Sequence, residues 1–230
     1  MRFELEAEKI LFESLSLLLV SHMKSLATLL SLSVCLIALH AAPVSLFDGK
    51  TLDGWEGETE KTWRVQDGMI VGGSLSETVP RNEFLCTKKR YKNFKFQVKV
   101  KLEGSEGEIN AGIQFRSERR PNHHEVIGYQ ADMASNPTYW GSLYDESRRD
   151  KMLATTPEEI TKKALKPTDW NDYEILCEGK RIQLFINGFK TIEYTETDPA
   201  IPETGIIGLQ IHGGGKALVR YKDISIEELP

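Results

Sequence analysis

The segment GSLYDESRR at residues 141–149 gathers groups that could bind a polar ligand and transfer protons. It holds a phenol at Tyr144, adjacent carboxylates at Asp145 and Glu146, and two guanidinium groups beginning with Arg148. Side chains of an extended segment alternate between its two faces, so Tyr144 and Glu146 face one side and Asp145 the other. We expect Asp145 and Arg148 to contribute polar contacts to a ligand. The alternative is a surface ion-pair cluster, which would add little stability.

Three further segments, residues 109–116, 126–132 and 207–212, place amides, a guanidinium, a carboxylate and an imidazole on one face. Each segment also has a glycine on that face. A glycine inside a strand weakens it but leaves room for another group to approach, so we expect this face to be the floor of a cleft. The polar members of the floor are Asn110, Gln114, Arg116, Gln130, Asp132, Gln210 and His212.

The ligand that suits such a floor is rich in hydroxyl groups. Amide, carboxylate and guanidinium groups offer the paired donors and acceptors that a sugar ring uses. Trp140 and Tyr144 would supply the apolar walls against which a ring stacks. The alternative is a solvated strand face on which the glycines mark β-bulges.

The elements that must position these groups are predicted to be β-strands. Apolar and polar residues alternate over residues 94–102, which is typical of a half-exposed antiparallel strand. Asn187-Gly188 between two such runs predicts a hairpin with a type I′ turn. Many short strands at regular spacing indicate an all-β fold, an antiparallel sandwich or jelly roll. Further strands are predicted at 63–65, 69–71, 172–177, 182–186, 191–194 and 217–227.

The ends of the domain and one helical turn can also be predicted. Residues 46–49 and 221–224 are expected to be terminal strands that pair, within one domain spanning residues 44–229. A helical turn is expected at Thr156-Pro157-Glu158-Glu159, with Thr156 as its cap and Pro157 in its first position.

The first 41 residues differ in kind from the rest. An apolar run of about 15 residues follows Lys24 and ends in small residues, which predicts a signal peptide at residues 23–41 and export to the periplasm or the extracellular space. Residues 1–22 are interpreted as an extension from an upstream start codon. A membrane anchor is the alternative, but the run is shorter than the roughly 20 residues that a span needs.

Charge and cysteine content exclude some functions. The net charge is -5 and no basic stripe is present, so a nucleic acid partner is not expected. Cys86 and Cys177 follow the predicted signal peptide and could form one disulfide after export. Both lie among apolar residues, which favours two buried free thiols.

Several motifs together resemble one known family, the 3-keto-disaccharide hydrolase domain, over essentially the whole chain after the signal peptide. They are LFDGKTLDGW at 46–55, WRVQDG at 63–68, NAGIQFR at 110–116, GYQAD at 128–132, WN at 170–171, ING at 186–188 and GLQIHG at 208–213. The resemblance implies a concanavalin A-like jelly roll, an exported bacterial protein, and activity on 3-keto-glycosides.

The implied chemistry is an elimination. A ketone at C3 acidifies the proton on C2, so a base can remove it and the glycosidic oxygen can leave C1 before water adds. We expect His212 or Asp132 as the base and Tyr144 or Glu146 as the acid, with Arg116 and Gln130 orienting the sugar or stabilising the enolate.

Two other functions are open alternatives. The first is a carbohydrate-binding module of the same fold without chemistry, and the second is a cell-surface interaction domain. No cofactor is expected, because the adjacent His123 and His124 diverge and give no familiar metal-ligand spacing. A divalent cation held by carboxylates or a histidine is the less favoured possibility.

Overall fold

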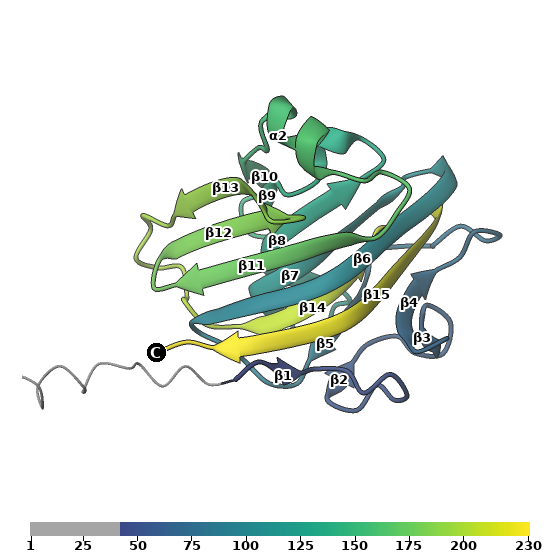
Figure 1. Ribbon diagram of the computed structural model, residues 1–230. Helices are drawn as coiled ribbons and strands as arrows, with labels where there is room; N and C mark the ends of the chain where they lie inside the picture. The colour runs from purple at the N-terminus through teal and green to yellow at the C-terminus, as the bar shows by residue number, and fades with distance from the viewer. Residues whose placement is uncertain (1–41) are drawn as a thin grey trace, which may run out of the picture. The chain divides into compact units, whose positions relative to one another are not determined.

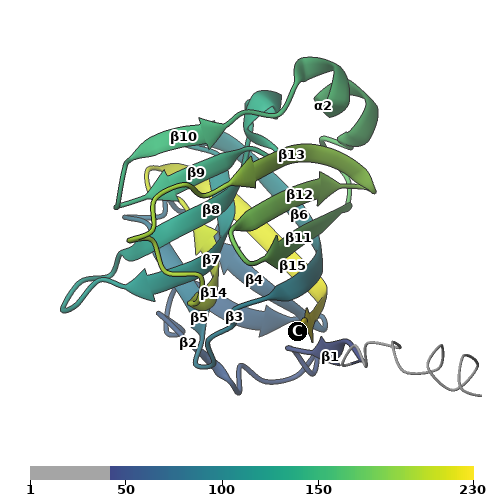
Figure 2. The same cartoon turned by 90° about the vertical axis from the view of Figure 1, so that its left-hand side faces the viewer.

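The computed structural model describes residues 42–230, which form a sandwich of two antiparallel β-sheets (Figures 1 and 2). The predicted signal peptide and upstream extension lie outside the described residues, so both stay predictions. The two-layer, all-β architecture expected from the sequence is confirmed.

The larger sheet contains eight strands. Its order is β13 (Phe189–Thr195), β12 (Arg181–Ile186), β11 (Asn171–Glu178), β6 (Phe94–Gly107), β15 (Gly215–Glu228), β4 (Met69–Gly73) and β3 (Trp63–Gln66). The short strand β1 (Val44–Ser45) pairs with β15 at Ile226 and Ser225, so the two ends of the domain meet as expected. The strand predicted at residues 46–49 is wrong, because β1 ends before it.

The second sheet contains seven strands and carries the polar face predicted from the sequence. Its order is β10 (Lys151–Ala154), β9 (Leu143–Glu146), β8 (Val126–Ala134), β7 (Asn110–Arg119), β14 (Ile206–Ile211), β5 (Glu83–Thr87) and β2 (Trp55–Glu56). A 3-10 turn, η1 (Pro137–Tyr139), joins β8 to β9, and one α-helix, α2 (Glu158–Ala164), lies between β10 and β11 in the described part of the chain. Within residues 42–230, none of the helices has the length and hydrophobicity that a membrane span requires.

The core lies between the sheets and follows the predicted alternation. Phe94, Phe96 and Val98 of β6 are buried, whereas the residues between them are half-buried or exposed. Ile113 of β7 and Leu209 of β14 face them from the other sheet. Burial of such alternating apolar faces is the main source of stability in a sandwich.

Two tyrosines of the larger sheet reach across this core to the backbone of the other sheet. Tyr173 of β11 donates from its hydroxyl to the Asp132 carbonyl oxygen at 3.1 Å. Tyr221 of β15 donates to the Gly112 carbonyl oxygen, also at 3.1 Å. A buried phenol needs a partner for its O–H, so each tyrosine fixes the backbone directly beneath the polar face.

Local predictions had mixed outcomes. The type I′ turn is confirmed, because Asn187 and Gly188 both have positive φ, 50° and 80°. The prediction of Thr156 as cap and Pro157 as first helical residue is wrong by one position: Pro157 is the N-cap of α2, and the Thr156 hydroxyl donates to the Trp140 carbonyl oxygen instead. The prediction of two buried free thiols is confirmed, since Cys86 and Cys177 are both buried and form no disulfide.

Candidate functional site

The strand register places polar residues in one row across the seven-stranded sheet. Gln130 of β8 is opposite Gln114 of β7 on one side and Tyr144 of β9 on the other. Asp132 is opposite Gly112, which in turn is opposite Gln210 of β14. All of these side chains leave the sheet on the face away from the core, as their parity predicted.

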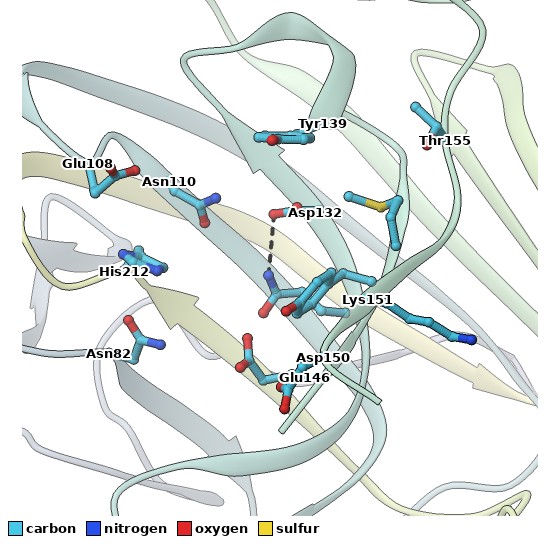
Figure 3. Close-up of a pocket in the computed structure, with 13 residues that line it drawn as sticks. Asn82, Glu108, Asn110, Asp132, Tyr139, Glu146, Asp150, Lys151, Thr155 and His212 are labelled. Carbon is cyan, nitrogen blue, oxygen red and sulfur yellow. Dashed lines mark hydrogen bonds between the residues drawn. The ribbon is translucent and has the colours of Figure 1, made fainter. Parts of the chain in front are cut away.

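A pocket of about 560 Å³ opens above this row (Figure 3). Six of the twelve residues predicted from the sequence line it: Asn110, Gln130, Asp132, Tyr144, Glu146 and His212. Seven further residues complete its wall: Asn82, Glu108, Tyr139, Asp150, Lys151, Met152 and Thr155. Asp132 occupies the middle of Figure 3, with Asn110 and His212 on one side of it and Lys151 on the other.

Asp132 is the most deeply placed carboxyl group of the pocket. Its side chain accepts hydrogen bonds from Gln130 Nε2 at 3.2 Å and from the Met133 amide at 2.9 Å, and both end on Oδ1. Neither of these two bonds occupies Oδ2, and the Asn110 side chain is a further donor beside the carboxyl group. Burial raises the pKa of Asp132 to about 7, although the hydrogen bonds from Met133, Gln130 and Asn110 act to lower it.

Glu146 is a second carboxyl group whose pKa is raised. Burial, followed by the negative charges of Glu125, Asp150 and Asp132, raises its pKa to about 7. Tyr144 lies on the same strand as Glu146, two residues before it, and burial also raises the pKa of its hydroxyl group. At neutral pH the pocket therefore holds two carboxyl groups poised to gain or lose a proton.

His212 offers a nitrogen lone pair. Its Nδ1 lies 2.6 Å from the Gly213 carbonyl oxygen, which can only accept, so Nδ1 carries the proton and Nε2 of the neutral ring is an acceptor. Asn82 is fixed in a related way: its Oδ1 accepts from the Gly213 amide at 3.0 Å, which leaves its Nδ2 as a free donor. These two residues form a donor and acceptor pair at one end of the pocket.

Arg116 does not face the pocket, so the parity prediction for it is wrong. The ladder between β7 and β8 shifts register between Phe115 and Glu118, and Arg116 has a positive φ of 46°. This bulge turns the guanidinium toward the carbonyl oxygens of Lys92 and Gly179, to which it donates.

Gln114 and Gln210 lie on the predicted face but below the pocket rather than in its lining. Both are 0% exposed. Gln114 Nε2 donates to Gln130 Oε1 at 2.6 Å, whereas the Gln210 amide has no hydrogen-bond partner in the described part of the chain.

The glycines of this face have a different role from the one predicted. A Cβ at Gly112 would lie 2.5 Å from Gln130 Cδ, and a Cβ at Gly128 would lie 2.3 Å from Ser117 Oγ. The glycines therefore make room for the protein's own polar side chains and not for a ligand.

Trp140 is not a wall of the pocket. It is 4% exposed, belongs to the core, and donates from Nε1 to the Ala134 carbonyl oxygen at 2.8 Å. Its neighbour Tyr139, in η1, lines the pocket instead and is 39% exposed. Residues 137–139 form a 3-10 turn and not a strand, so strand alternation does not predict that Tyr139, and not Trp140, lines the pocket.

Asp145 and Arg148 form a buried ion cluster behind the pocket, so they contribute no pocket contacts. Asp145 is 0% exposed and pairs with both Arg148 and Arg149, while Arg149 also pairs with Glu196 at 2.8 Å. The Arg148 guanidinium stacks over the Tyr129 ring, 4.6 Å from its centroid. The opposite orientations predicted for Asp145 and Glu146 are confirmed. The carboxylates of the cluster, Asp145 and Glu196, are buried, while Arg148 and Arg149 are half-buried.

The residues that sequence reasoning missed lie mostly in connections. Asn82 precedes β5, Glu108 lies in the turn between β6 and β7, and Asp150 precedes β10. No strand alternation relates such positions to the cleft, although Asp150 directly follows the segment at 141–149. No group of three or more His, Cys, Asp or Glu side chains within residues 42–230 is placed to hold a metal ion.

Comparisons with known proteins agree with the fold. A protein from Parabacteroides distasonis ATCC 8503, provisionally described as a glycosyl hydrolase, superposes with a TM-score of 0.60 at 21% identity, covering 82% of this chain and 94% of its own. The carbohydrate-binding module CBM66 from Bacillus subtilis gives 0.59 at 14% identity, covering 76% and 96%. A Bacillus subtilis protein with a galectin-like fold gives 0.53 at 9% identity, covering 77% and 90%. These likenesses confirm the predicted jelly roll.

A search of curated protein sequences gave no significant match. The family comparison, in contrast, covers nearly the whole described domain. Residues 42–227 match the family described as the 3-keto-alpha-glucoside-1,2-lyase-like domain, which confirms the resemblance seen in the sequence motifs. The chain belongs to this family of carbohydrate-active domains.

Proposed function

We propose that this domain cleaves the glycosidic bond of 3-keto-glycosides by elimination followed by hydration, with Asp132 as the base and Glu146 as the acid. The observation that carries the proposal is the presence of two carboxyl groups of raised pKa in one polar pocket, of which Asp132 uses only Oδ1 in its bonds with Gln130 and Met133. Acid and base groups with pKa values near the working pH are the most effective at proton transfer.

The proposed reaction balances without a cofactor. Asp132 Oδ2 takes the proton from C2, and the electron pair forms an enolate whose charge rests on the C3 oxygen. The enolate then expels the oxygen bonded to C1, which takes a proton from Glu146 and leaves as an alcohol. Water adds to C1, its proton passes to Glu146, and C2 regains its proton from Asp132.

The other end of the pocket would hold the sugar ring. Asn82 Nδ2 and the Asn110 amide can donate to the ketone oxygen, where negative charge develops. His212 Nε2 can accept a hydrogen bond from a sugar hydroxyl. Tyr139 offers an exposed aromatic face for stacking. His212 is the alternative base, because its free nitrogen lone pair faces the same pocket.

The decisive experiment compares two leaving groups. Asp132→Asn should lower turnover of both a 3-keto-nitrophenyl glucoside and a 3-keto-disaccharide by about 10²–10⁴-fold. Glu146→Gln should slow leaving-group release from the disaccharide but not the first release of nitrophenolate, which leaves without protonation; hydration, in which Glu146 takes the proton of water, should be slowed for both substrates. Glu174→Gln, an exchange on the other sheet, is the control and should leave both rates unchanged.

Two outcomes would contradict the proposal. Full turnover by Asp132→Asn would remove Asp132 as the base and favour His212. Sugar binding by the unaltered protein without release of either leaving group would identify a carbohydrate-binding module. Since the elimination needs no cofactor, adding a chelator should not change the rates.

A further inference from the structure

A chain of buried side chains runs beneath the pocket and ends on Asp132; we call it the amide relay. It consists of Ser117, Gln114 and Gln130. Ser117 Oγ lies 3.2 Å from Gln114 Oε1, Gln114 Nε2 donates to Gln130 Oε1 at 2.6 Å, and Gln130 Nε2 donates to Asp132 Oδ1 at 3.2 Å. Ser117 and Gln114 are 0% exposed, and Gln130 is 3% exposed.

The direction of this chain follows from chemistry. An ionised carboxylate can only accept, so the end of the Gln130 amide nearest Asp132 must be its nitrogen. Gln130 Oε1 then faces Gln114 and needs a donor, which Gln114 Nε2 supplies. Without Gln114, no member of the amide relay would contact the end of the Gln130 amide that faces away from Asp132, so its two orientations would not be distinguished there.

The backbone is shaped to hold the amide relay. A Cβ at Gly112 would lie 2.5 Å from Gln130 Cδ, one at Gly208 would lie 3.2 Å from Gln114 Cβ, and one at Gly128 would lie 2.3 Å from Ser117 Oγ. Gly112 and Gly128 therefore each accommodate one member, whereas the space at Gly208 is bounded by both Cys86 Sγ, 3.1 Å away, and Gln114. A solvated strand face would have no need for this arrangement, since exposed side chains can turn toward water.

We infer that Gln114 is a positioning residue, which fixes the Gln130 amide so that its nitrogen holds Asp132 Oδ1 and Oδ2 faces the substrate. This inference rests on the proposed function, in which Asp132 is the base. Gln114 touches no substrate, because it does not line the pocket.

The inference predicts how substitutions in the amide relay change the pKa of Asp132. The hydrogen bond from Gln130 stabilises the ionised carboxylate, so losing it raises the pKa of Asp132 further. The other titratable groups around Asp132 are unchanged by substitutions in the amide relay. They are Tyr144 and Glu146 of β9, Asp150 and Lys151 at the start of β10, Tyr173 of β11, Glu108 of the turn between β6 and β7, and His212 after β14.

The test is a double-mutant cycle on the full chain with Gln114→Met, Gln130→Met and the double variant. Methionine keeps the shape of glutamine but cannot donate. Gln130→Met should move the acidic limb of the profile of kcat/KM against pH upward by about one unit, a tenfold loss at low pH. Gln114→Met should move it in the same direction, and the double variant should match Gln130→Met alone, because residues acting in series are not additive. Gln183→Met, a buried glutamine of β12, is the matched control and should leave the limb in place.

A second readout separates this inference from the proposed function. The pKa of Asp132 can also be obtained from the dependence of unfolding free energy on pH, with Asp132→Asn as the reference. An upward shift in Gln114→Met supports the amide relay even if no protein turns over a 3-keto-glycoside, in which case the proposed function fails alone. An unmoved pKa and acidic limb in Gln114→Met, or additive shifts in the double variant, would overturn the inference while leaving turnover intact.

Discussion

Replacing Asp132 with Asn should stabilise the protein at neutral and higher pH while removing the proposed turnover. The buried carboxyl group is 5% exposed, and burial raises its pKa from the ordinary 3.8 to about 7. The native state therefore binds the proton more tightly than the unfolded state between these pH values. Stability from this group is complete at low pH and is lost as the pH rises through about 7.

The size of the effect follows from the difference in pKa. A difference of about three pKa units corresponds to about 4 kcal/mol, since one unit is worth ~1.36 kcal/mol. Asparagine keeps Oδ1 as the acceptor for Gln130 Nε2 and the Met133 amide. Asn110 donates to the carboxyl group of the native protein, so its amide must turn for the unpartnered Oδ1 of Asn110 to accept from the new Nδ2. The variant therefore avoids the buried charge without leaving the acceptor bonds unmade.

The measurement is chemical denaturation of both proteins at about pH 5 and about pH 8. The stability advantage of Asp132→Asn should grow by about 2.5 kcal/mol between these two conditions, because most of the ionisation falls between them. Glu174→Gln removes a half-buried carboxylate of β11 on the other sheet and should show no such growth. An advantage that stays constant with pH, or a variant less stable than the parent at pH 8, would refute the assignment of the buried charge to Asp132.

Three further substitutions test other parts of the site. Arg149→Met removes a partner of both Asp145 and Glu196 and should destabilise the protein by about 3–5 kcal/mol in thermal or chemical unfolding; a loss well below that range would mean the cluster is solvated. Tyr139→Ala should weaken sugar affinity without affecting the melting temperature, whereas Trp140→Phe should lower the melting temperature and leave affinity alone; the reverse pattern would restore Trp140 as the pocket wall. Gly112→Ala should displace Gln130 and move the acidic limb of kcat/KM to higher pH, as Gln130→Met does. An unmoved limb would contradict the role of Gly112 in making room for Gln130.

The sequence predicts the fold and half of the pocket because both depend on strand alternation. Asn110, Gln130 and Asp132 face the pocket for the same reason that Ile113 and Leu209 face the core: the pleat has a fixed period. That period also predicted that Asp145 and Glu146 point to opposite sides. Where strands are regular, the sequence is therefore sufficient to assign a side chain to a face.

The prediction fails where the backbone leaves that period. The bulge at Arg116 and the 3-10 turn before Trp140 each change which way a side chain points, and neither is visible in an alternation pattern. Asn82 and Glu108 belong to connections whose position depends on how the strands of the sheet come together. The glycines were recognised as unusual, but sequence alone does not say which neighbour occupies the space that they leave.

The segment at 141–149 shows why charged groups gather at one strand. Asp145 points inward, where Arg148 and Arg149 tie it to Glu196 after β13, and this buried cluster holds β9 in place. Tyr144 and Glu146 then point outward from the same fixed strand into the pocket. Burial alone would raise the pKa of Glu196, but its hydrogen bonds with Arg149 and Tyr129 lower that pKa to about 2. Glu196 therefore stays charged at any pH at which Asp132 and Glu146 exchange protons. The two adjacent carboxylates therefore have different roles: Asp145 is paired with arginines in a structural cluster, whereas Glu146 lines the pocket with a raised pKa.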